Sequence, residues 1–269
     1  MTTGDGNTLQ EPLLSVCHLR KSFGHVHAVD DVSLDIYPRE VVGLIGDNGA
    51  GKSTFLSLLT GYYHADSGEF IYKGHRVPMS SPKTSRRNLK IEMIYQDLRL
   101  APDLPVRENL FLGEEPKILG IFLNKRYMQQ SAAKVLQRLN VGAKPSDLLN
   151  RLSGGEQQAV AIGRALLFDR DIILMDEPTA SISVNKVQDV LRMIRDLKEH
   201  GKTVILVSHR LEDILEVSDR IVVFFHGRIR AMVKNEGLQI SDLVHLMFEA
   251  AADPRKEEIA AAGESGSLA

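Results

Sequence analysis

The sequence contains a single cysteine, Cys17, so the chain cannot form an internal disulfide bond, which suits a reducing compartment. It also lacks long apolar runs. Stretches such as residues 221–225 fall far short of the ~20 residues of a membrane-spanning helix. The first twelve residues have neither the basic start nor the apolar stretch of a secretory signal. If the protein works at a membrane, we therefore expect another molecule to recruit it.

No sign of charge dominates the composition. The chain has 33 Lys and Arg against 35 Asp and Glu, a net charge of −2, which gives no support for a nucleic-acid coat or a polybasic membrane anchor. The hydrophobic fraction of 43% and the charged fraction of 25% are typical of a globular protein. Residues 1–12 and 252–269 contain few large apolar side chains, so we expect both ends to be flexible.

Between these ends, strand-like and helix-like patterns alternate. Strands are expected over 32–36, 40–45, 68–74, 91–95, 171–175, 203–207, 220–225 and 228–233. Helices are expected over 52–60, 184–197, 210–217 and 238–248, with a mostly helical stretch over 105–168. The alternation predicts an α/β fold with a mostly parallel sheet covered on both faces. The interruption from about 97 to 168 predicts a separate helical lobe.

The sequence from Gly46 to Thr54, GDNGAGKST, follows an apolar strand and precedes a helix. It matches the phosphate-binding pattern G-x-x-x-x-G-K-[ST]. Its glycines let the backbone N–H groups point inward at phosphate oxygens, and the helix N-terminus adds its dipole. Lys52 would reach the β- and γ-phosphates, and Ser53 would hold Mg²⁺. The loop therefore predicts a nucleoside triphosphate site.

A second candidate site is a pair of acidic residues, Asp176 and Glu177, which follow the apolar strand at 172–175 and precede Pro178. Adjacent acids at the carboxyl end of a buried strand emerge at the sheet edge where the phosphate loop also lies. Asp176 suits a Mg²⁺ ligand, and Glu177 could orient or deprotonate an attacking water.

The segment Leu152–Gln158, LSGGEQQ, begins another predicted helix. Ser153 is a good N-cap, and Glu156 completes a capping box. The two glycines in the first turn lower helix propensity, but they suit a helix end that an anion approaches closely.

Together these three motifs resemble those of the nucleotide-binding subunit of ABC transporters, over residues 13–233 and in the expected order. The resemblance implies a RecA-like P-loop NTPase core, an N-terminal antiparallel β subdomain and an inserted helical subdomain at about 97–168. It implies an ATPase domain over 13–234, followed by a C-terminal helix at 235–251. ATP and Mg²⁺ are the implied cofactors.

The resemblance also assigns roles to individual residues. Glu177, His209 and Lys52 would be catalytic, with His209 as the switch histidine and Gln96 in the Q-loop. Ser53, Gln96 and Asp176 would hold the metal ion. Nucleotide binding is implied for Phe23, Gly46, Asp47, Asn48, Gly49, Ala50, Gly51, Lys52, Ser53, Thr54, Gln96 and Asp176. Phe23 would stack on adenine.

In this family two ATPase domains pack head to tail, which implies a homodimer or a similar partner. The signature residues Ser153, Gly154, Gly155, Glu156 and Gln157 would then contact ATP held by the partner. The chain departs from the common pattern at Ser183, which occupies the usual position of the D-loop aspartate. That change puts strict coupling between the two sites in doubt.

The small hydroxyl residue at 183, together with residues 46–49 and 108–113, is similar to the ATPases of monosaccharide importers in their single-copy form. This implies an ATPase at the cytoplasmic face of a membrane, bound to permease subunits and indirectly served by an extracytoplasmic sugar-binding protein. Two alternatives stay open: a soluble ABC ATPase that acts on nucleic acid or ribosomes, and a P-loop small-molecule kinase. The compact gap between Gln96 and Ser153 and the near-neutral charge disfavour nucleic acid.

Overall fold

The computed structural model describes residues 11–78, 81–180, 182 and 184–248. Most of the two ends predicted to be flexible, and also Ser183, lie outside these residues. Among the described helices, none combines the length and the apolar character that crossing a membrane requires.

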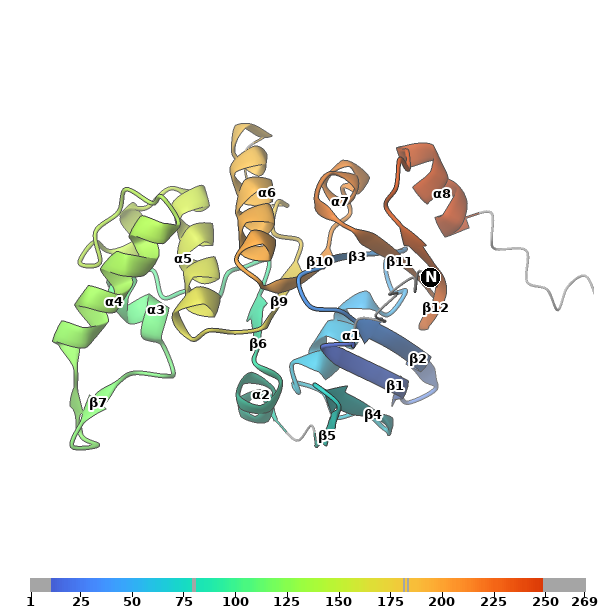
Figure 1. The fold of residues 1–269 in the computed structure, drawn as a ribbon, viewed down its shortest axis with the longest axis horizontal. Helices are drawn as coiled ribbons and strands as arrows, with labels where there is room; N and C mark the ends of the chain where they lie inside the picture. Colours follow the sequence, from blue (N-terminus) through green and yellow to red (C-terminus); the bar gives the residue numbers. More distant parts are fainter. Residues whose placement is uncertain (1–10, 79–80, 181, 183, 249–269) are drawn as a thin grey trace, which may run out of the picture.

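A six-stranded sheet forms the centre of the molecule (Figure 1). Its strands, in spatial order, are β12 (Arg228–Lys234), β11 (Arg220–Phe225), β3 (Val41–Ile45), β10 (Thr203–Val207), β9 (Ile172–Asp176) and β6 (Ile91–Ile94). All neighbours are parallel except the β11–β12 hairpin. The continuous apolar runs that predicted β3, β10 and β9 are buried on both faces, as a covered parallel sheet requires, whereas the edge strand β12 is largely exposed or half-buried.

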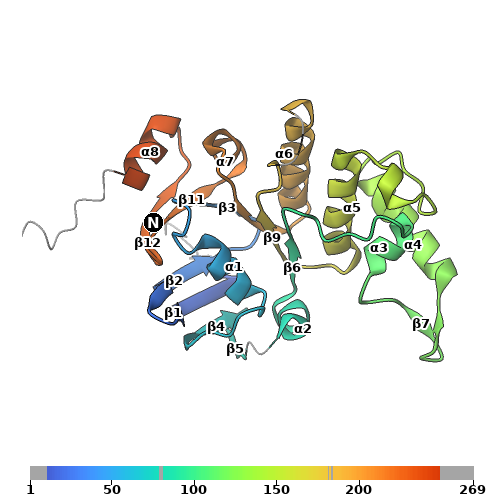
Figure 2. The same cartoon turned by 180° about the vertical axis from the view of Figure 1, so that it is seen from behind.

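Alternate residues of the central strands enter two different hydrophobic clusters. Leu44 and Leu174 pack with helix α1 (Lys52–Leu59) on one face. Ile45 and Met175 pack on the other face, which is covered by the helices α5 (Gly154–Leu167), α6 (Val184–Glu199) and α7 (Leu211–Val217). Figure 2 shows the same arrangement from behind.

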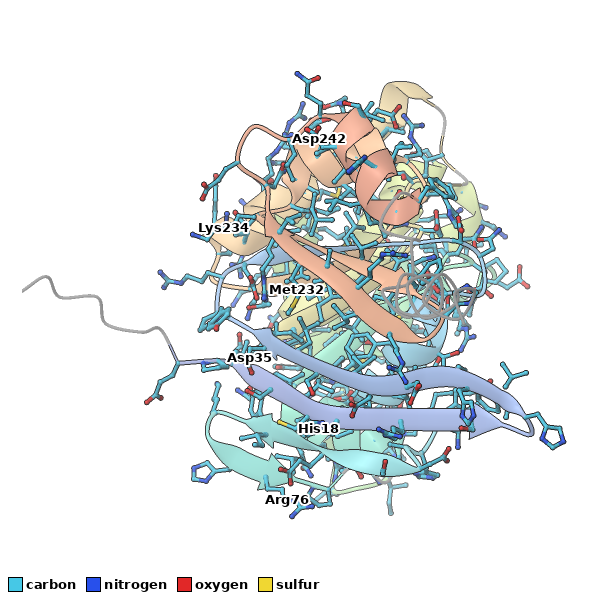
Figure 3. The ribbon with its side chains drawn as sticks, turned by 90° about the vertical axis from the view of Figure 1, so that its right-hand side faces the viewer. His18, Asp35, Arg76, Met232, Lys234 and Asp242 are labelled. Atoms are coloured by element: carbon cyan, nitrogen blue, oxygen red, sulfur yellow. The ribbon has the colours of Figure 1, made fainter. Side chains whose placement is uncertain are left out.

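A second, antiparallel sheet packs beside α1, with the strand order β2-β1-β4-β5. The strands are β1 (Leu14–Phe23), β2 (Val26–Ile36), β4 (Ser67–Tyr72) and β5 (His75–Val77). Figure 3 shows this end of the molecule, with His18 and Asp35 on the sheet and Met232 and Lys234 on β12. The two sheets and the inserted helices confirm the predicted fold class.

Three helices form the inserted lobe: α3 (Val106–Phe111), α4 (Lys125–Arg138) and α5. They enclose a third hydrophobic cluster, to which α5 contributes Val160 while Ile162 of the same helix packs in the main core. Gly163 lets α5 approach its neighbours closely, because a Cβ atom there would lie 2.9 Å from Val135 and 3.0 Å from Leu110.

Part of the mostly helical stretch predicted over 105–168 is not helical. Strands β7 (Lys117–Ile118) and β8 (Phe122–Leu123) form a small hairpin between α3 and α4. Gly113, Pro116 and Gly120 lie in this segment, and such residues disfavour a continuous helix. Four short elements were also missed: β5, the helical turn α2 (Pro82–Thr84), the π-helix at 85–89 and the 3₁₀ turn at 149–151.

The C-terminal helix, expected over 235–251, begins only at Ile240 as α8 (Ile240–Phe248). Residues 235–239 do not continue the helix, because Gly237 has φ 76°, outside the right-handed helical region, and the Gln239 N–H donates to the Asp242 carboxylate at 2.8 Å just before the helix start. The last three residues of the predicted range lie outside the described residues.

Buried charges join the lobe to the central sheet. Glu92 of β6 is 2% exposed, and its carboxylate lies 3.6 Å from Arg164 on α5 and 3.4 Å from Arg170. Arg86 lies 3.5 Å from the same carboxylate, and Arg170 also pairs with Glu114. The strand that leads to Gln96 is thereby tied to the helix that begins at the signature residues.

Candidate nucleotide site

The phosphate-loop sequence forms a tight turn between β3 and α1 at the carboxyl edge of the central sheet. Two of its glycines adopt conformations that side chains do not tolerate: Gly46 has φ 142°, and Gly51 has φ 106°. A Cβ atom would lie 2.2 Å from the Phe224 carbonyl oxygen at Gly46 and 2.4 Å from that of Ala28 at Gly51. The loop can therefore lie against β11 and β2 only because these residues are glycine.

Lys52 is held inside this turn. Its ammonium group donates to the carbonyl oxygens of Gly46 at 2.5 Å and Asp47 at 2.9 Å. Burial lowers the pKa of Lys52, while the negative charges of Glu177, Asp47 and Asp176 oppose the shift. The loop thus presents a cation beside the free N–H groups at the start of α1, which is an arrangement that attracts anions.

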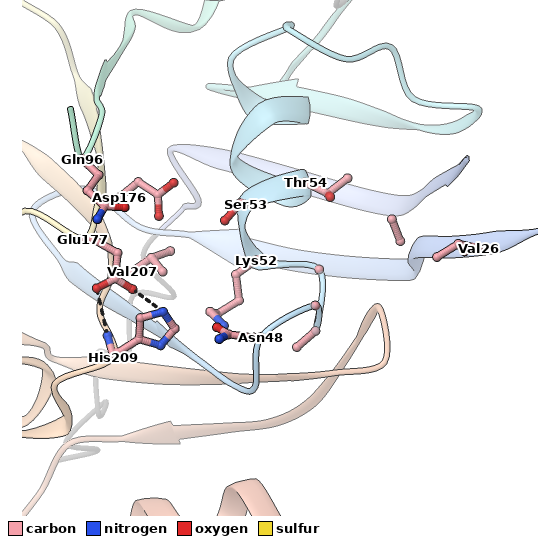
Figure 4. A pocket seen from close by; sticks show the side chains of 14 residues that line it. Val26, Asn48, Lys52, Ser53, Thr54, Gln96, Asp176, Glu177, Val207 and His209 are labelled. Carbon is pink, nitrogen blue, oxygen red and sulfur yellow. Dashed lines mark hydrogen bonds and ion pairs between the residues drawn. The ribbon is translucent and has the colours of Figure 1, made fainter. Parts of the chain in front are cut away.

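A cleft of about 260 Å³ opens along the loop (Figure 4). It brings together residues from the loop, β2, the segment after β6, and the ends of β9 and β10. Its lining residues are Val26, Ala28, Asn48, Gly49, Ala50, Gly51, Lys52, Ser53, Thr54, Gln96, Asp176, Glu177, Val207 and His209. The predicted loop residues 48–54 therefore share one cleft with Gln96, Asp176, Glu177 and His209. Gly46 and Asp47 do not line it; their carbonyl oxygens accept from Lys52.

Asp176 ends β9 and faces this cleft with Ser53 and Gln96 (Figure 4). Burial raises the pKa of its carboxyl group, with Lys52 and His209 opposing the shift. Within the described part of the chain, the Asp176 carboxylate accepts no hydrogen bond. A half-buried carboxylate without a donor, beside hydroxyl and amide oxygens, fits a hard divalent cation such as Mg²⁺.

Glu177 is held on a left-handed backbone with φ 52°, and its N–H donates to the Val207 carbonyl at 2.9 Å. Its carboxylate lies 3.0 Å from Nε2 of His209 and accepts the His209 backbone N–H at 3.3 Å. Burial raises the pKa of the Glu177 carboxyl group, and the contacts with His209 oppose the shift. Positive φ at a non-glycine residue is costly and is concentrated at functional sites.

Phe23 does not line the cleft. Its ring packs edge-to-face on Tyr63, with the centroids 5.0 Å apart, and Lys21 lies 5.4 Å from its centroid. Val26 and Ala28 of β2 form the adjoining apolar wall instead. No motif marks these two residues in the sequence, because they reach the site only through the packing of β2 on the loop.

The signature residues lie elsewhere. Ser153 caps α5, accepting the Glu156 N–H at 3.4 Å, while the Glu156 carboxylate accepts the Ser153 N–H at 2.8 Å, so the predicted capping box is confirmed. Gln157 donates to the Leu152 carbonyl at 3.1 Å. Ser153, Gly155 and Glu156 line a different cleft, between α5 and α6. Apart from its own helix and chain neighbours, no atom of the described residues lies within 4 Å of a Cβ built at Gly154.

The fold and the phosphate cleft define a P-loop nucleotide-binding protein. The family model described as "ABC transporter" matches residues 29–180. A nucleotide-free ATP-binding cassette from an ABC transporter is similar in structure, with a TM-score of 0.74, 28% identity, and coverage of 92% of this chain and 98% of that one. A dimeric cassette bound to ADP and Pi has a TM-score of 0.69 at 25% identity, covering 84% and 100% of the two chains.

Several relatives in sequence are import ATP-binding proteins. The chain is 42% identical to the xylose/arabinose import ATP-binding protein XylG of Sulfolobus acidocaldarius, over 87% of this chain and 93% of that protein. It is 36% identical to the fructose import ATP-binding protein FrcA of Rhizobium meliloti, over 94% and 99%. The chain belongs to the ABC transporter ATP-binding family, and the resemblance seen in the motifs is confirmed.

Some relatives are longer. The ribose import ATP-binding protein RbsA 3 of Rubrobacter xylanophilus is 41% identical over 88% of this chain. The match spans only 48% of that protein. The chain therefore spans about half the length of several relatives, while it spans nearly all of XylG and FrcA.

Proposed function

We propose that this protein is the ATP-hydrolysing subunit of an ABC importer for a monosaccharide. The observation that carries the proposal is the single cleft that gathers Lys52, Asp176, Glu177 and His209 around the phosphate loop. The sugar-import names of the relatives support the substrate class.

Nucleotide binding would rest on the loop amides and Lys52. The turn keeps the Lys52 ammonium group at the loop carbonyls, so an incoming phosphate would find the cation already positioned. Preorganised cations and N–H groups stabilise the charge that develops on a transferring phosphoryl group. Phe23 would contact the adenine only if its ring left Tyr63.

Ser53, Gln96 and Asp176 would hold Mg²⁺, since their oxygen atoms face one cleft and the Asp176 carboxylate lacks another donor. A bound Mg²⁺ would neutralise charge on the phosphate oxygens.

Glu177 would accept the proton of the attacking water at its carboxylate. The bond between its N–H and Val207 fixes its backbone, and the His209 contacts fix its carboxylate. A raised pKa brings a carboxylate closer to the basicity that proton abstraction needs near neutral pH. His209 would position Glu177 and reach the γ-phosphate.

The complete site would need two chains. Within one chain the signature residues line a cleft separate from the phosphate loop, so the N-terminus of α5 is free to approach a second copy. In a head-to-tail homodimer, Ser153 and Gly155 would contact the nucleotide held by the partner subunit. The dimeric cassette bound to ADP and Pi supports such an assembly.

Coupling to transport would pass through Gln96. This residue lies between the nucleotide cleft and a second pocket lined by Tyr95, Asp97 and Arg99, next to the helical lobe. The permease subunits would dock on this side, at the cytoplasmic face of the membrane. A sugar-binding protein on the other side would supply the substrate.

Replacement of Glu177 by glutamine tests the proposal. Glu177→Gln should retain ATP binding but lower the hydrolysis rate by about 10²- to 10⁴-fold, the usual contribution of a general base. ATP should then hold the two subunits together, giving a long-lived dimer in size-exclusion chromatography. The matched control is Glu69→Gln, a half-buried residue of β4 whose carboxylate pairs with Arg76 away from the cleft. Unimpaired turnover in Glu177→Gln would contradict the mechanism.

A further inference from the structure

The β7–β8 hairpin exposes apolar side chains to solvent. Leu119 is 88% exposed, Ile121 is 76% exposed and Phe122 is 68% exposed. Together with Ile118 and Leu123, which are also exposed, these residues form what we call the hairpin tip. A contiguous exposed apolar patch of this kind marks an interaction surface.

The backbone of the hairpin holds the tip outward. Leu119 has φ 52° and Gly120 has φ 76°, and the Ile121 N–H donates to the Ile118 carbonyl at 3.3 Å. Turns with two left-handed residues favour Asn-Gly, because a bulky side chain at positive φ is strained. The strained residue here is a leucine with almost no contact to the protein. The turn therefore presents an apolar side chain at its apex at a cost to stability.

Basic residues adjoin the hairpin and continue along helix α4. Helix α4 has the sequence KRYMQQSAAKVLQR, with four basic residues and no acidic one. We call Lys117 of β7 and the four cations of α4 the basic ridge: Lys117, Lys125, Arg126, Lys134 and Arg138. All five are exposed, and within the described residues none forms an ion pair. The net charge of −2 for the whole chain conceals this local excess.

The two acids closest to Lys117 in the sequence, Glu114 and Glu115, have partners within the protein. Glu114 pairs with the buried Arg170, and the Glu115 carboxylate accepts the Gly113 N–H at 2.9 Å. They therefore do not neutralise the ridge. Tyr127, on the first turn of α4, is 51% exposed while its ring packs on Phe111 at 6.0 Å, an amphipathic position typical of a polar–apolar boundary.

The hairpin projects from the helical lobe at one end of the molecule, and β12 and α8 lie at the other end (Figures 1 and 2). We propose that the hairpin tip and the basic ridge bind an anionic lipid surface. The apolar side chains would enter the boundary between headgroups and acyl chains, and Lys117, Lys125 and Arg126, which adjoin the hairpin, would face the lipid phosphates. This inference goes beyond the proposed function, because it requires neither nucleotide nor permease.

Sedimentation of the full chain with lipid vesicles tests the proposal. The protein should bind vesicles of phosphatidylcholine and phosphatidylglycerol, and should bind vesicles of phosphatidylcholine alone much more weakly. Leu119→Asp should lower the partition coefficient at least about tenfold, as expected for a lost buried leucine. The pair Lys125→Gln and Arg126→Gln should lower it roughly 25-fold, about fivefold for each cation.

Matched controls lie at the other end of the molecule (Figure 3). Met232→Asp replaces an apolar side chain that is 51% exposed, and Lys234→Gln removes an exposed cation. Neither should change vesicle binding. ATP hydrolysis in solution should stay unchanged in all these variants, so that failure of this inference is distinguishable from failure of the proposed function.

A fluorescent reporter gives a second measurement, since the sequence contains no tryptophan. The emission of Phe122→Trp should shift to shorter wavelength on anionic vesicles and be quenched by brominated lipids. The emission of Met232→Trp should do neither. Absence of vesicle binding, or equal binding by the wild type and Leu119→Asp, would overturn the proposal. If the wild type binds no vesicles and Leu119→Asp loses co-purification with a membrane protein, the tip binds a protein partner and the lipid assignment is overturned.

Discussion

The buried carboxylate of Glu92 offers a sharp test of how the helical lobe is held to the sheet. In Glu92→Gln the side chain keeps its shape and an oxygen acceptor but loses its charge. Arg164 and Arg170, whose side chains are 12% and 7% exposed, would then face a neutral amide. The variant creates no cavity, so its effect on stability reports the electrostatic contribution of the network.

The size of the effect follows from the remaining contacts. Breaking a buried ion pair by removing one partner costs about 3–5 kcal/mol. Arg170 keeps Glu114 and donates to the Arg86 carbonyl at 3.0 Å, and the Arg86 side chain is 35% exposed. We therefore expect the lower end of that range, about 3 kcal/mol. For a chain of this length, this corresponds to a fall in Tm of roughly 6–12 °C.

Urea denaturation followed by circular dichroism measures the free energy of unfolding, and calorimetry measures Tm. Glu69→Gln is the control, because its partner Arg76 at 2.9 Å is largely exposed and such surface pairs contribute about 0–1 kcal/mol. A loss in Glu92→Gln no larger than in Glu69→Gln would refute the reasoning.

Three further predictions concern the nucleotide site and its supports. Burial raises the pKa of Glu177. As pH falls, its active ionised form should therefore be lost at a pH above the ordinary glutamate pKa of about 4.3. A kcat/KM profile whose acid midpoint lies at or below that value would contradict this prediction. Thr179→Val removes a buried hydroxyl that donates to Asp213 at 2.6 Å, and should lower the free energy of unfolding in urea by about 1–3 kcal/mol. Ser153→Ala removes the N-cap of α5 and should cost about 1 kcal/mol in the same assay; an unchanged midpoint would mean that Glu156 alone secures the helix start.

The central sheet could be predicted from sequence because its strands are short, apolar on both faces and followed by marked turns. Strand β1 was not predicted, since its alternation is broken: the register with β2 shifts between Val16 and Leu19, where His18 has φ 50°. Such a bulge reverses the inward-facing positions and removes the period-two pattern. The β7–β8 hairpin lies in a helix-rich segment and has too few residues to show a period.

The nucleotide site also contains residues that could be predicted from sequence motifs and residues that could not. The phosphate-loop residues follow one another in the sequence, and so do Asp176 and Glu177, so each group forms a motif that could be predicted. Val26 and Ala28 carry no motif, and their place in the cleft depends on long-range packing. Glu92 gave one signal, a charged residue within an apolar strand, but its arginine partners come from distant positions that local patterns cannot connect.

The glycine at position 163 has a consequence for how the helical lobe moves. Because α5 lies against Val135 and Leu110 without an intervening methyl group, α3, α4 and α5 share one tightly packed cluster. Packed interiors resist gradual deformation, so a displacement at one end of α5 moves the three helices together as a rigid body. The same body carries Ser153 at one end and the β7–β8 hairpin at another. Any tilt imposed at the signature residues would therefore reach the hairpin undiminished.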